Sequence, residues 1–462
     1  MHPLHPNETN WIDQVNNSLM LAHMPFYEQQ YWEKRSIYRV PAHITNLNSE
    51  AYRPQVVSFG PHHHHDLHPM EDHKRRALLC FLRRSEKPLE RFLESLKDVL
   101  GALEESYDVL DPMWKKDSGE GAADRFLQLM ITDGCFMLEI LRFANMEVYD
   151  YAPNDPIFSK HGRLYILPVI GRDMLLLENQ LPMLVLDRLV AVCDDKKEDE
   201  YINELILKYL GASENNPSTG KCLHVLDVFR KNRVQLNLDK VVSMGNLNNA
   251  CTGTCLHVLD VFEKSLLMES KKNKKKKSKG GLEIILPATE LREHGIQFRQ
   301  SSTNSLKEIS FASGVLRLPV IVVDDSTESM FLNLIAFERL HIQAGTEVTS
   351  YICFMNHLID KAQDIALLRK KGIIQNYMES DEVAAKLFNS VAKDVMLDPD
   401  SSLHDTINKV RKYCMKRGHK WRANLEHIYF RNPWVILSII AAFLLFGLTT
   451  IQTVYTVLGY KK

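Results

Sequence analysis

The stretch that decides the fold class is RFLQLMITDGCFMLEILRF, residues 125–143, along which a long apolar stripe runs. Apolar residues that recur three and four positions apart are typical of a helix with one buried face. The period is clearest in residues 89–107, where Glu90, Glu94 and Lys97 lie between the apolar positions. Both stretches therefore predict helices.

Similar stripes predict further helices along the chain, in residues 173–192, 329–339, 346–368 and 381–396. Two short β-branched runs with interrupting prolines, residues 164–170 and 315–323, predict brief strands or extended links rather than a large sheet. The expected fold class is therefore mainly α, a single large helical domain with a few short strands.

Composition excludes some classes of protein. The 462 residues are 45% hydrophobic and 25% charged, which is ample material for a core, and the formal net charge of −1 argues against a nucleic-acid partner. The 8 cysteines form no CxxC pair, so buried reduced thiols in a cytosolic compartment are expected. Cys251, Cys255 and His257 lack the second ligand pair of a zinc finger, so we expect neither a metal nor another cofactor.

The C-terminal run WVILSIIAAFLLFGLTTIQTVYTVL, residues 434–458, contains no charged residue. At about 1.5 Å per residue, a helix of this length can cross a hydrocarbon core of about 30 Å. The run therefore predicts one transmembrane helix, marked by Trp434, Leu445, Gly447 and Leu458, and the lipid bilayer as a partner.

Basic residues near this run predict its orientation. Five lysines and arginines lie between positions 416 and 431, against Lys461 and Lys462 after the run, which places the bulk of the chain in the cytosol. Residues 1–26 lack the basic and apolar regions of a signal peptide, which agrees with that orientation. The expected location is a membrane, for which the plasma membrane is one candidate.

Two segments break the helical pattern. The octapeptide CLHVLDVF occurs at residues 222–229 and again at 255–262, and the lysine-rich run KKNKKKKSKGG follows at residues 271–281. Two copies are too few for a solenoid, and a block of like charges does not pack. We interpret residues 231–280 as an insertion within a domain of residues 37–430, between an extension of residues 1–36 and a terminal region of residues 431–462.

The familiar catalytic signatures are missing from the sequence, which has no P-loop, no Rossmann glycine motif, no nucleophile elbow and no HExxH. The histidine run at residues 62–65, with His68 and His73, is interpreted as an exposed turn that binds metals only opportunistically. Polar residues within apolar segments are the other candidates: Asp133, Glu139, Glu178, Asn179, Gln180 and Glu290.

A buried acid is either paired or has a shifted pKa that suits catalysis, and pairing is the commoner case. Pro182 leaves carbonyl groups free one turn earlier in the helix, and the side chains of Glu178, Asn179 and Gln180 could fill those vacancies. We therefore interpret these residues as a structural motif and predict no catalytic residue.

Successive blocks of this sequence resemble one plant family, the "domain of unknown function 247" family. The blocks are residues 37–41, 52–61, 70–74, 132–139, 175–182, 223–227, 288–296, 314–319, 333–338 and 429–434. Departures from the family pattern are His62 and His65, which replace an aromatic residue and a glycine, and a shorter stretch before Met70. The family has one LHxLD block, so the second copy and the lysine run look like an insertion.

The resemblance implies a single-pass, C-terminally anchored plant protein with no established enzymatic activity. Genes of this family in grasses lie at self-incompatibility loci and are regarded as male specificity determinants. The expected function is thus recognition or signalling through an unknown protein partner, including a self-incompatibility determinant, with no small-molecule substrate. The alternative is a membrane-bound enzyme that uses Asp133, Glu139 or Glu178 with a histidine, which requires these groups to converge in one pocket.

Overall fold

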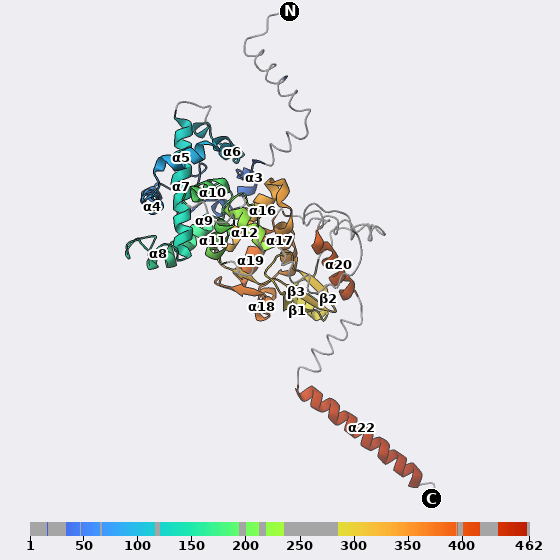
Figure 1. The fold of residues 1–462 in the computed structure, drawn as a ribbon. Coiled ribbons are helices and arrows are strands. Elements are labelled where there is room, and N and C mark those ends of the chain that lie inside the picture. The colour runs from blue at the N-terminus through green and yellow to red at the C-terminus, as the bar shows by residue number, and fades with distance from the viewer. Residues whose placement is uncertain are drawn as a thin grey trace, which may run out of the picture.

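The computed structural model describes residue 16 and residues 34–46, 48–64, 67–115, 121–193, 200–211, 219–234, 285–393, 395, 401–415 and 433–459. Within these ranges the protein is mainly helical (Figure 1), with two small sheets formed by residues of the C-terminal half.

The N-terminal half is built from helices around one long central helix, α7, which Figure 1 shows upright among its neighbours. Its elements are α3 (Ala42–Thr45), η1 (Ser49–Tyr52), η2 (His68–Met70), α4 (Glu71–Ser85), α5 (Leu89–Lys97), α6 (Leu100–Glu105), η3 (Pro112–Trp114), α7 (Ala122–Ala144), α8 (Lys160–Tyr165), α9 (Leu167–Asp173), α10 (Met183–Cys193), α11 (Tyr201–Tyr209) and α12 (Val225–Val234).

The C-terminal half adds helices and all five strands of the described residues. Its elements are α15 (Ala288–Glu293), β1 (Gln297–Gln300), β2 (Ser310–Ala312), β3 (Val315–Leu318), β4 (Ile321–Val323), α16 (Thr327–Leu340), η5 (Ile342–Ala344), α17 (Glu347–Leu358), α18 (Ala362–Lys370), β5 (Ile374–Asn376), α19 (Asp381–Val391), α20 (Ser402–Cys414) and α22 (Pro433–Gly459).

The strands form one three-stranded and one two-stranded sheet. In the first, β3 lies in the centre, parallel to β1 and antiparallel to β2. In the second, β4 pairs in parallel with β5, with Ile321 opposite Ile374. Such short strands are stable only when they pack against helices, and Leu316, Leu318 and Val323 are fully buried in the common core.

Helix α7 confirms the prediction for residues 125–143 and is buried on nearly every side. Between Phe126 and Phe143 most side chains are buried, including Asp133 and Glu139. Gly134 permits a close approach of α10, because a Cβ there would lie 2.6 Å from Leu189 and 2.9 Å from Val185. A helix that is apolar all round is expected in the centre of a large domain.

Other predicted helices are confirmed, but the structure divides three of them. The stretch 89–107 splits into α5 and α6, and 346–368 into α17 and α18. In residues 173–192 only α10 is a regular helix, because residues 174–182 form an irregular segment after α9. Periodicity alone does not locate such breaks, since both sides of each break keep apolar positions in register.

The two predicted extended runs have opposite outcomes. Residues 315–323 contain β3 and β4, separated at Pro319, as predicted. Residues 164–170, apart from Ile166, are helical, as the end of α8 and the start of α9, so the prediction of a brief strand or extended link there was wrong. Pro168 occupies the first turn of α9, where the missing N–H group has no helical partner to lose.

The predicted transmembrane helix requires correction. Helix α22 covers residues 434–458 and lies apart from the other helices in Figure 1, with exposed side chains such as Leu445. A Cβ added at Gly447 would meet no atom within 4 Å. Thr449 and Thr450 interrupt the apolar run of α22 and donate hydrogen bonds to carbonyl groups of their own helix.

No helix in the described part of the chain is long and apolar enough to cross a membrane. This finding overturns the predicted span, and the fold class is corrected to mainly α with a few short strands, without a transmembrane helix. The side chains of Trp434 and Leu458 lie outside the described residues.

Several other predictions also fall outside the described residues. These concern most of the extension of residues 1–36, the insertion from residue 235 onward with its second CLHVLDVF copy, Cys251, Cys255 and the lysine run, and the basic residues from 416 to 431.

Candidate functional site

The segment of residues 55–60, here called the buried strap, runs from the exposed Gln55 into the interior, where residues 57–60 are buried, and it belongs to no helix or sheet. Its backbone groups therefore need other partners. Asp173, at the end of α9, accepts the N–H groups of Gln55, Val56 and Val57 at 3.0, 2.8 and 3.0 Å. Burial raises the pKa of Asp173, and these three N–H groups oppose that shift.

Asn179 holds the next part of the buried strap. Its side-chain oxygen accepts the N–H group of Phe59 at 2.7 Å, and its amide nitrogen donates to the carbonyls of Val57 and Asp173, both at 3.0 Å. The oxygen and the nitrogen of the side-chain amide are thus both satisfied within the protein. Asn179 joins the segment after α9 to the buried strap.

Gln180 secures the irregular segment itself. Its amide nitrogen donates to the carbonyls of Met174 and Leu176 at 2.6 and 2.7 Å, and its oxygen accepts the N–H group of Leu226 in α12 at 3.2 Å. Pro182 lies just before α10 and its carbonyl accepts the N–H group of Val185 at 2.9 Å.

Asp133 and Lys74 form an ion pair at 2.8 Å in which both side chains are 0% exposed. Asp133 also accepts the N–H group of Gly60 at 2.8 Å, and Lys74 donates to the Ser58 carbonyl at 2.6 Å and pairs with Glu71 at 2.7 Å. Burial raises the pKa of Asp133 to about 6, against the influence of Lys74. The pair therefore holds the C-terminal end of the buried strap through the N–H group of Gly60 and the carbonyl of Ser58.

Glu139 lies further along α7 and has different partners. Arg84 of α4 donates to its two oxygens at 2.6 and 2.5 Å, and the Tyr151 hydroxyl donates to the same carboxylate. Arg84 also contacts Asp150 at 3.1 Å. Burial and Glu139 raise the pKa of Tyr151, so the phenol is a hydrogen-bond donor and not a base.

Glu178 connects the segment after α9 to the start of the domain. One oxygen accepts the N–H group of Val40 at 2.8 Å, and the other lies 3.6 Å from Nε2 of His63 and 3.9 Å from Arg39. Glu290, in contrast, is exposed on α15, and its backbone carbonyl accepts a hydrogen bond from the His294 backbone.

The described part of the histidine run, residues 62–64, is packed against the body and is not the exposed turn that we expected, whereas His65 lies outside the described residues. His63 is 8% exposed, the His62 ring meets Tyr107 edge-on at 5.5 Å, and the His64 ring meets Trp114 at 5.3 Å. Burial lowers the pKa of His62 to about 3, so its ring is neutral. No group of three potential ligands that could hold a metal occurs among the described residues.

The structure therefore does not bring Asp133, Glu139 and Glu178 together around one space. Asp133 pairs with Lys74 of α4, and Glu139 pairs with Arg84 of the same helix. Glu178 accepts the N–H group of Val40. Sequence reasoning missed the partners Lys74, Arg84 and Asp173, for which the only signal was a basic or acidic residue within a helix that carries an apolar stripe.

A second polar network joins α12 to the start of α17. Arg230 lies 3.2 Å from Glu338 and 2.8 Å from Glu347, and Glu338 also accepts the N–H groups of Val348 and Thr349. Carboxylates near the first N–H groups of a helix stabilise its positive end. The partners of Arg230 and Glu338 in this network are thus residues of the protein itself.

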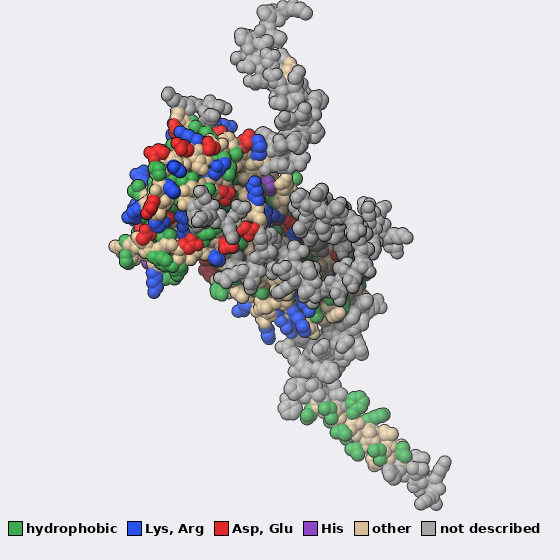
Figure 2. All heavy atoms as spheres, viewed as in Figure 1, with side chains coloured by type: hydrophobic (Ala, Val, Ile, Leu, Met, Phe, Trp, Pro, Cys, Tyr) green, Lys and Arg blue, Asp and Glu red, His purple; other side chains and the backbone are tan. Residues whose placement is uncertain are grey.

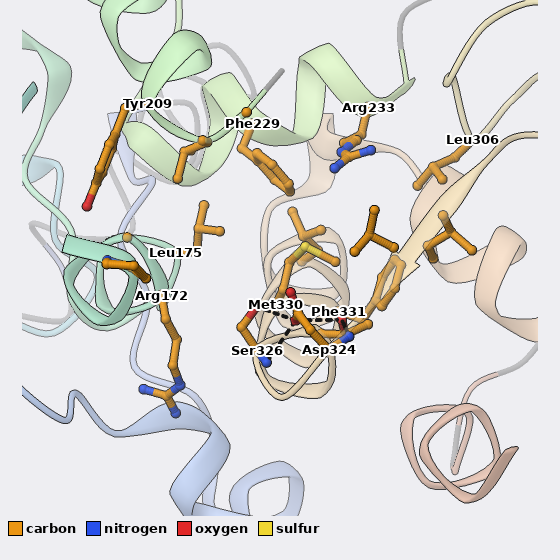
Figure 3. Close-up of a pocket in the computed structure, with 18 of the residues that line it drawn as sticks. Arg172, Leu175, Tyr209, Phe229, Arg233, Leu306, Asp324, Ser326, Met330 and Phe331 are labelled. Atoms are coloured by element: carbon orange, nitrogen blue, oxygen red, sulfur yellow. Dashed lines mark hydrogen bonds between the residues drawn. The ribbon is translucent and has the colours of Figure 1, made fainter. Parts of the chain in front are cut away.

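A cavity of about 380 Å³ lies between α9, α11 and α12 on one side and β4 and α16 on the other. Figure 3 shows Phe229, Arg233 and Leu306 facing Asp324, Ser326 and Met330 across it. Arg172 and Arg233 are its basic lining residues, and none of the acids predicted from the sequence lines it. The cavity has the volume of a small-molecule site.

Comparisons of the sequence with known proteins indicate one plant family. The family DUF247, described as "Plant protein of unknown function", matches residues 37–448. The chain is similar to UPF0481 protein At3g47200 of Arabidopsis thaliana, with 30% identity over 93% of this chain and 87% of the relative. It is also similar to putative UPF0481 protein At3g02645 of Arabidopsis thaliana, with 24% identity over 96% of this chain and 94% of the relative. No solved structure matches the chain.

Proposed function

This chain belongs to the plant DUF247 family of proteins of unknown function, and we propose that it acts in recognition or signalling by binding another protein. The observation that carries this proposal is an exposed apolar patch around α8. The patch consists of Met146, Tyr149, Leu164 and Tyr165, which are 54%, 74%, 61% and 63% exposed. We call it the α8 patch.

The α8 patch has a defined shape because α8 is held against the end of α7. Arg163 donates to the Phe143 carbonyl at 2.7 Å, lies over the Phe143 ring at 4.8 Å, and contacts the Met146 sulfur at 2.9 Å. Figure 2 shows hydrophobic side chains gathered where Figure 1 labels α8.

The composition of the α8 patch suits a protein partner. Tyrosine, methionine and arginine are enriched at protein interfaces, and rigid aromatic side chains contribute large contact area at low entropic cost. Asp133, Glu139 and Glu178 are occupied by internal partners, so no specific observation favours the alternative of an enzyme that uses them.

The test is proximity labelling in plant cells that express the full chain fused to a biotin ligase. Three versions are compared: the parent, a patch variant with Met146, Tyr149, Leu164 and Tyr165 changed to serine, and a control variant. In the control, two exposed hydrophobic residues outside the patch, Ile342 (87%) and Tyr377 (72%), are changed to serine.

We expect a set of proteins that the parent and the control label and the patch variant does not. Each candidate from this set is then purified and titrated with the three versions, and the patch variant should bind at least 10-fold more weakly, because one lost anchor is worth about 2 kcal/mol. Identical labelling and equal affinity for all three versions would contradict the proposal.

Self/non-self discrimination is a narrower form of the same proposal. A specificity determinant must differ between individuals at the surface that its partner reads. Sequencing of alleles decides this point: an α8 patch that is invariant among individuals with different specificities would exclude that role for the patch.

A further inference from the structure

The cavity between α12 and α16 has mostly apolar walls. Its apolar lining residues include Leu175, Phe229, Leu306, Met330, Phe331 and Leu334. Its charged lining residues are Arg172, Arg233 and Asp324, and their surroundings decide which ligand the cavity suits. Apolar walls with a few polar groups are typical of small-molecule sites.

Arg172 and Asp324 already have partners. Arg172 donates to the carbonyls of Arg53 and Glu50 at 3.1 and 3.0 Å and to Asp173 at 2.9 Å, and in Figure 3 its guanidinium points away from the cavity. Asp324 accepts the N–H group of Ser326 at 3.0 Å in the turn before α16. Neither side chain is available as the main contact for a ligand.

Arg233 differs from these residues. It lies in the last turn of α12, reaches into the cavity between Phe229 and Leu306 (Figure 3), and its guanidinium lies 5.1 Å from the centre of the Phe229 ring. No carboxylate among the described residues lies within 4.0 Å of it, whereas Arg230, one turn earlier, pairs with Glu338 and Glu347. Desolvation by the surrounding side chains lowers the pKa of Arg233.

A second polar group near Arg233 has no hydrogen-bond partner in the described part of the chain. The Tyr351 side chain is 0% exposed, and its hydroxyl makes no hydrogen bond to the described residues. The Tyr351 ring stacks on Phe331 of the cavity wall at a centroid distance of 6.3 Å, and its hydroxyl is close enough to Arg233 for the guanidinium charge to oppose the rise in the pKa of the phenol that burial causes. Buried donors without acceptors are rare in folded proteins.

We propose that this cavity binds a small organic acid with an apolar body, whose carboxylate pairs with the guanidinium of Arg233. The apolar body lies against Met330, Leu334 and Leu306, and the carboxylate provides an acceptor that the described residues do not offer to Arg233. A planar guanidinium matches a carboxylate with two parallel hydrogen bonds. A ligand with a single charge is favoured because, among the described lining residues, Arg233 alone directs a cation into the cavity, and Asp324 repels a second negative charge.

The test is calorimetric titration of the purified full chain with three apolar monocarboxylates: 2-naphthoate, 4-phenylbutyrate and octanoate. Their neutral amides serve as matched ligands of the same shape. At least one acid should bind with saturation and at least 10-fold more tightly than its amide, since a hydrogen bond to a charged group is worth about 1.5–3 kcal/mol. This comparison uses the unaltered protein and needs no variant.

Variants then locate the charge contact. Arg233→Met should weaken binding of the acid at least 10-fold and leave binding of the amide unchanged, and Arg233→Lys should retain part of the affinity. Arg299→Met removes an exposed arginine of β1, outside the cavity, and should bind like the parent. Melting curves of each variant report folding separately.

Three outcomes would overturn the inference. The first is that none of the three acids binds with saturation. The second is that each acid binds no more tightly than its amide, and the third is that Arg233→Met, folded as the parent, keeps full affinity for the acid. Each of these results leaves the protein partner of the α8 patch untouched, because the two sites share no residue.

Discussion

Replacing Lys74 with methionine is the most direct test of the buried contacts that hold the strap. The change removes the ammonium group from between Asp133, Glu71 and the Ser58 carbonyl, at 2.8, 2.7 and 2.6 Å, and keeps most of the side-chain length. Asp133, which is 0% exposed, then keeps a carboxylate without a counter-charge.

The expected loss follows from this geometry. Breaking a buried ion pair by removal of one partner costs about 3–5 kcal/mol, because the remaining charge stays desolvated. The Ser58 carbonyl also loses its donor, which places the loss toward the upper end of that range. A loss of this size is a large part of the stability of an ordinary domain.

The loss should depend on pH in a defined direction. The pKa of Asp133 is already raised to about 6 in the folded state, from 3.8, so its folded form binds the proton more tightly than its unfolded form. The stability that protonated Asp133 contributes is present below pH 3.8 and disappears as the pH rises through about 6. Without Lys74 the carboxyl has a still higher pKa, so the difference between parent and Lys74→Met should shrink between pH 8 and pH 5.

The assay is urea denaturation of the full chain, followed by circular dichroism at pH 8, 7, 6 and 5. The matched control is Lys97→Met, which removes an exposed pair with Asp124 at 3.9 Å and should leave the midpoint unchanged. If Lys74→Met unfolds at the same urea concentration as the control at pH 8, the ion pair does not hold the strap. A difference that grows toward pH 5 would refute the assignment of the effect to Asp133.

Three further predictions concern the same interior. Asn179→Ala should lower the free energy of unfolding by about 1–3 kcal/mol, because backbone groups of the strap lose their partners; a variant as stable as the parent that has lost partner binding would instead give the amide a functional role. Gly60→Ala should lower the free energy of unfolding by about 1–3 kcal/mol, because φ is +72° and the new Cβ would lie 2.8 Å from a backbone carbonyl. The control is Gly101→Ala, where no atom lies within 4 Å of the new Cβ, and it should raise the free energy of unfolding by about 0.5–1 kcal/mol. Equal melting temperatures for the two variants would contradict this reasoning. His62→Gln should lose less stability than the parent as the pH falls below 6.5, because the pKa of His62 is about 3 in the folded protein and the unfolded chain therefore takes up the proton first. Thermal melts of both proteins at pH 7 and pH 5 check this. An equal fall of the melting temperature in the parent and the variant would contradict the prediction.

Much of the fold could be read from the sequence because helices are local structures. The apolar stripes at residues 125–143 and 381–396 predicted α7 and α19, and residues 315–323 predicted β3 and β4. The prediction of a brief strand or extended link at residues 164–170 failed because a short apolar run with a proline fits the first turn of a helix equally well. The breaks within residues 89–107 and 346–368 left no signal in the periodicity.

The C-terminal run shows a different limit of sequence reasoning. The length and lack of charge of residues 434–458 predicted a membrane span, whereas no helix among the described residues meets the requirements for one. The expected location and orientation rested on that span and on basic residues outside the described ranges, so they stay predictions.

The sequence by itself determined the mainly helical class, because the spacing of apolar residues along one segment is enough to favour a helix with a buried face. It also indicated the family through the order of its motif blocks. Only the tertiary structure decided which groups meet. Asp133 contacts Lys74 and Gly60, Asn179 contacts Phe59, and Arg233 contacts no acid among the described residues. These contacts join residues up to 120 positions apart, and the pKa, charge and availability of a buried side chain depend on such neighbours in space rather than on its neighbours in sequence.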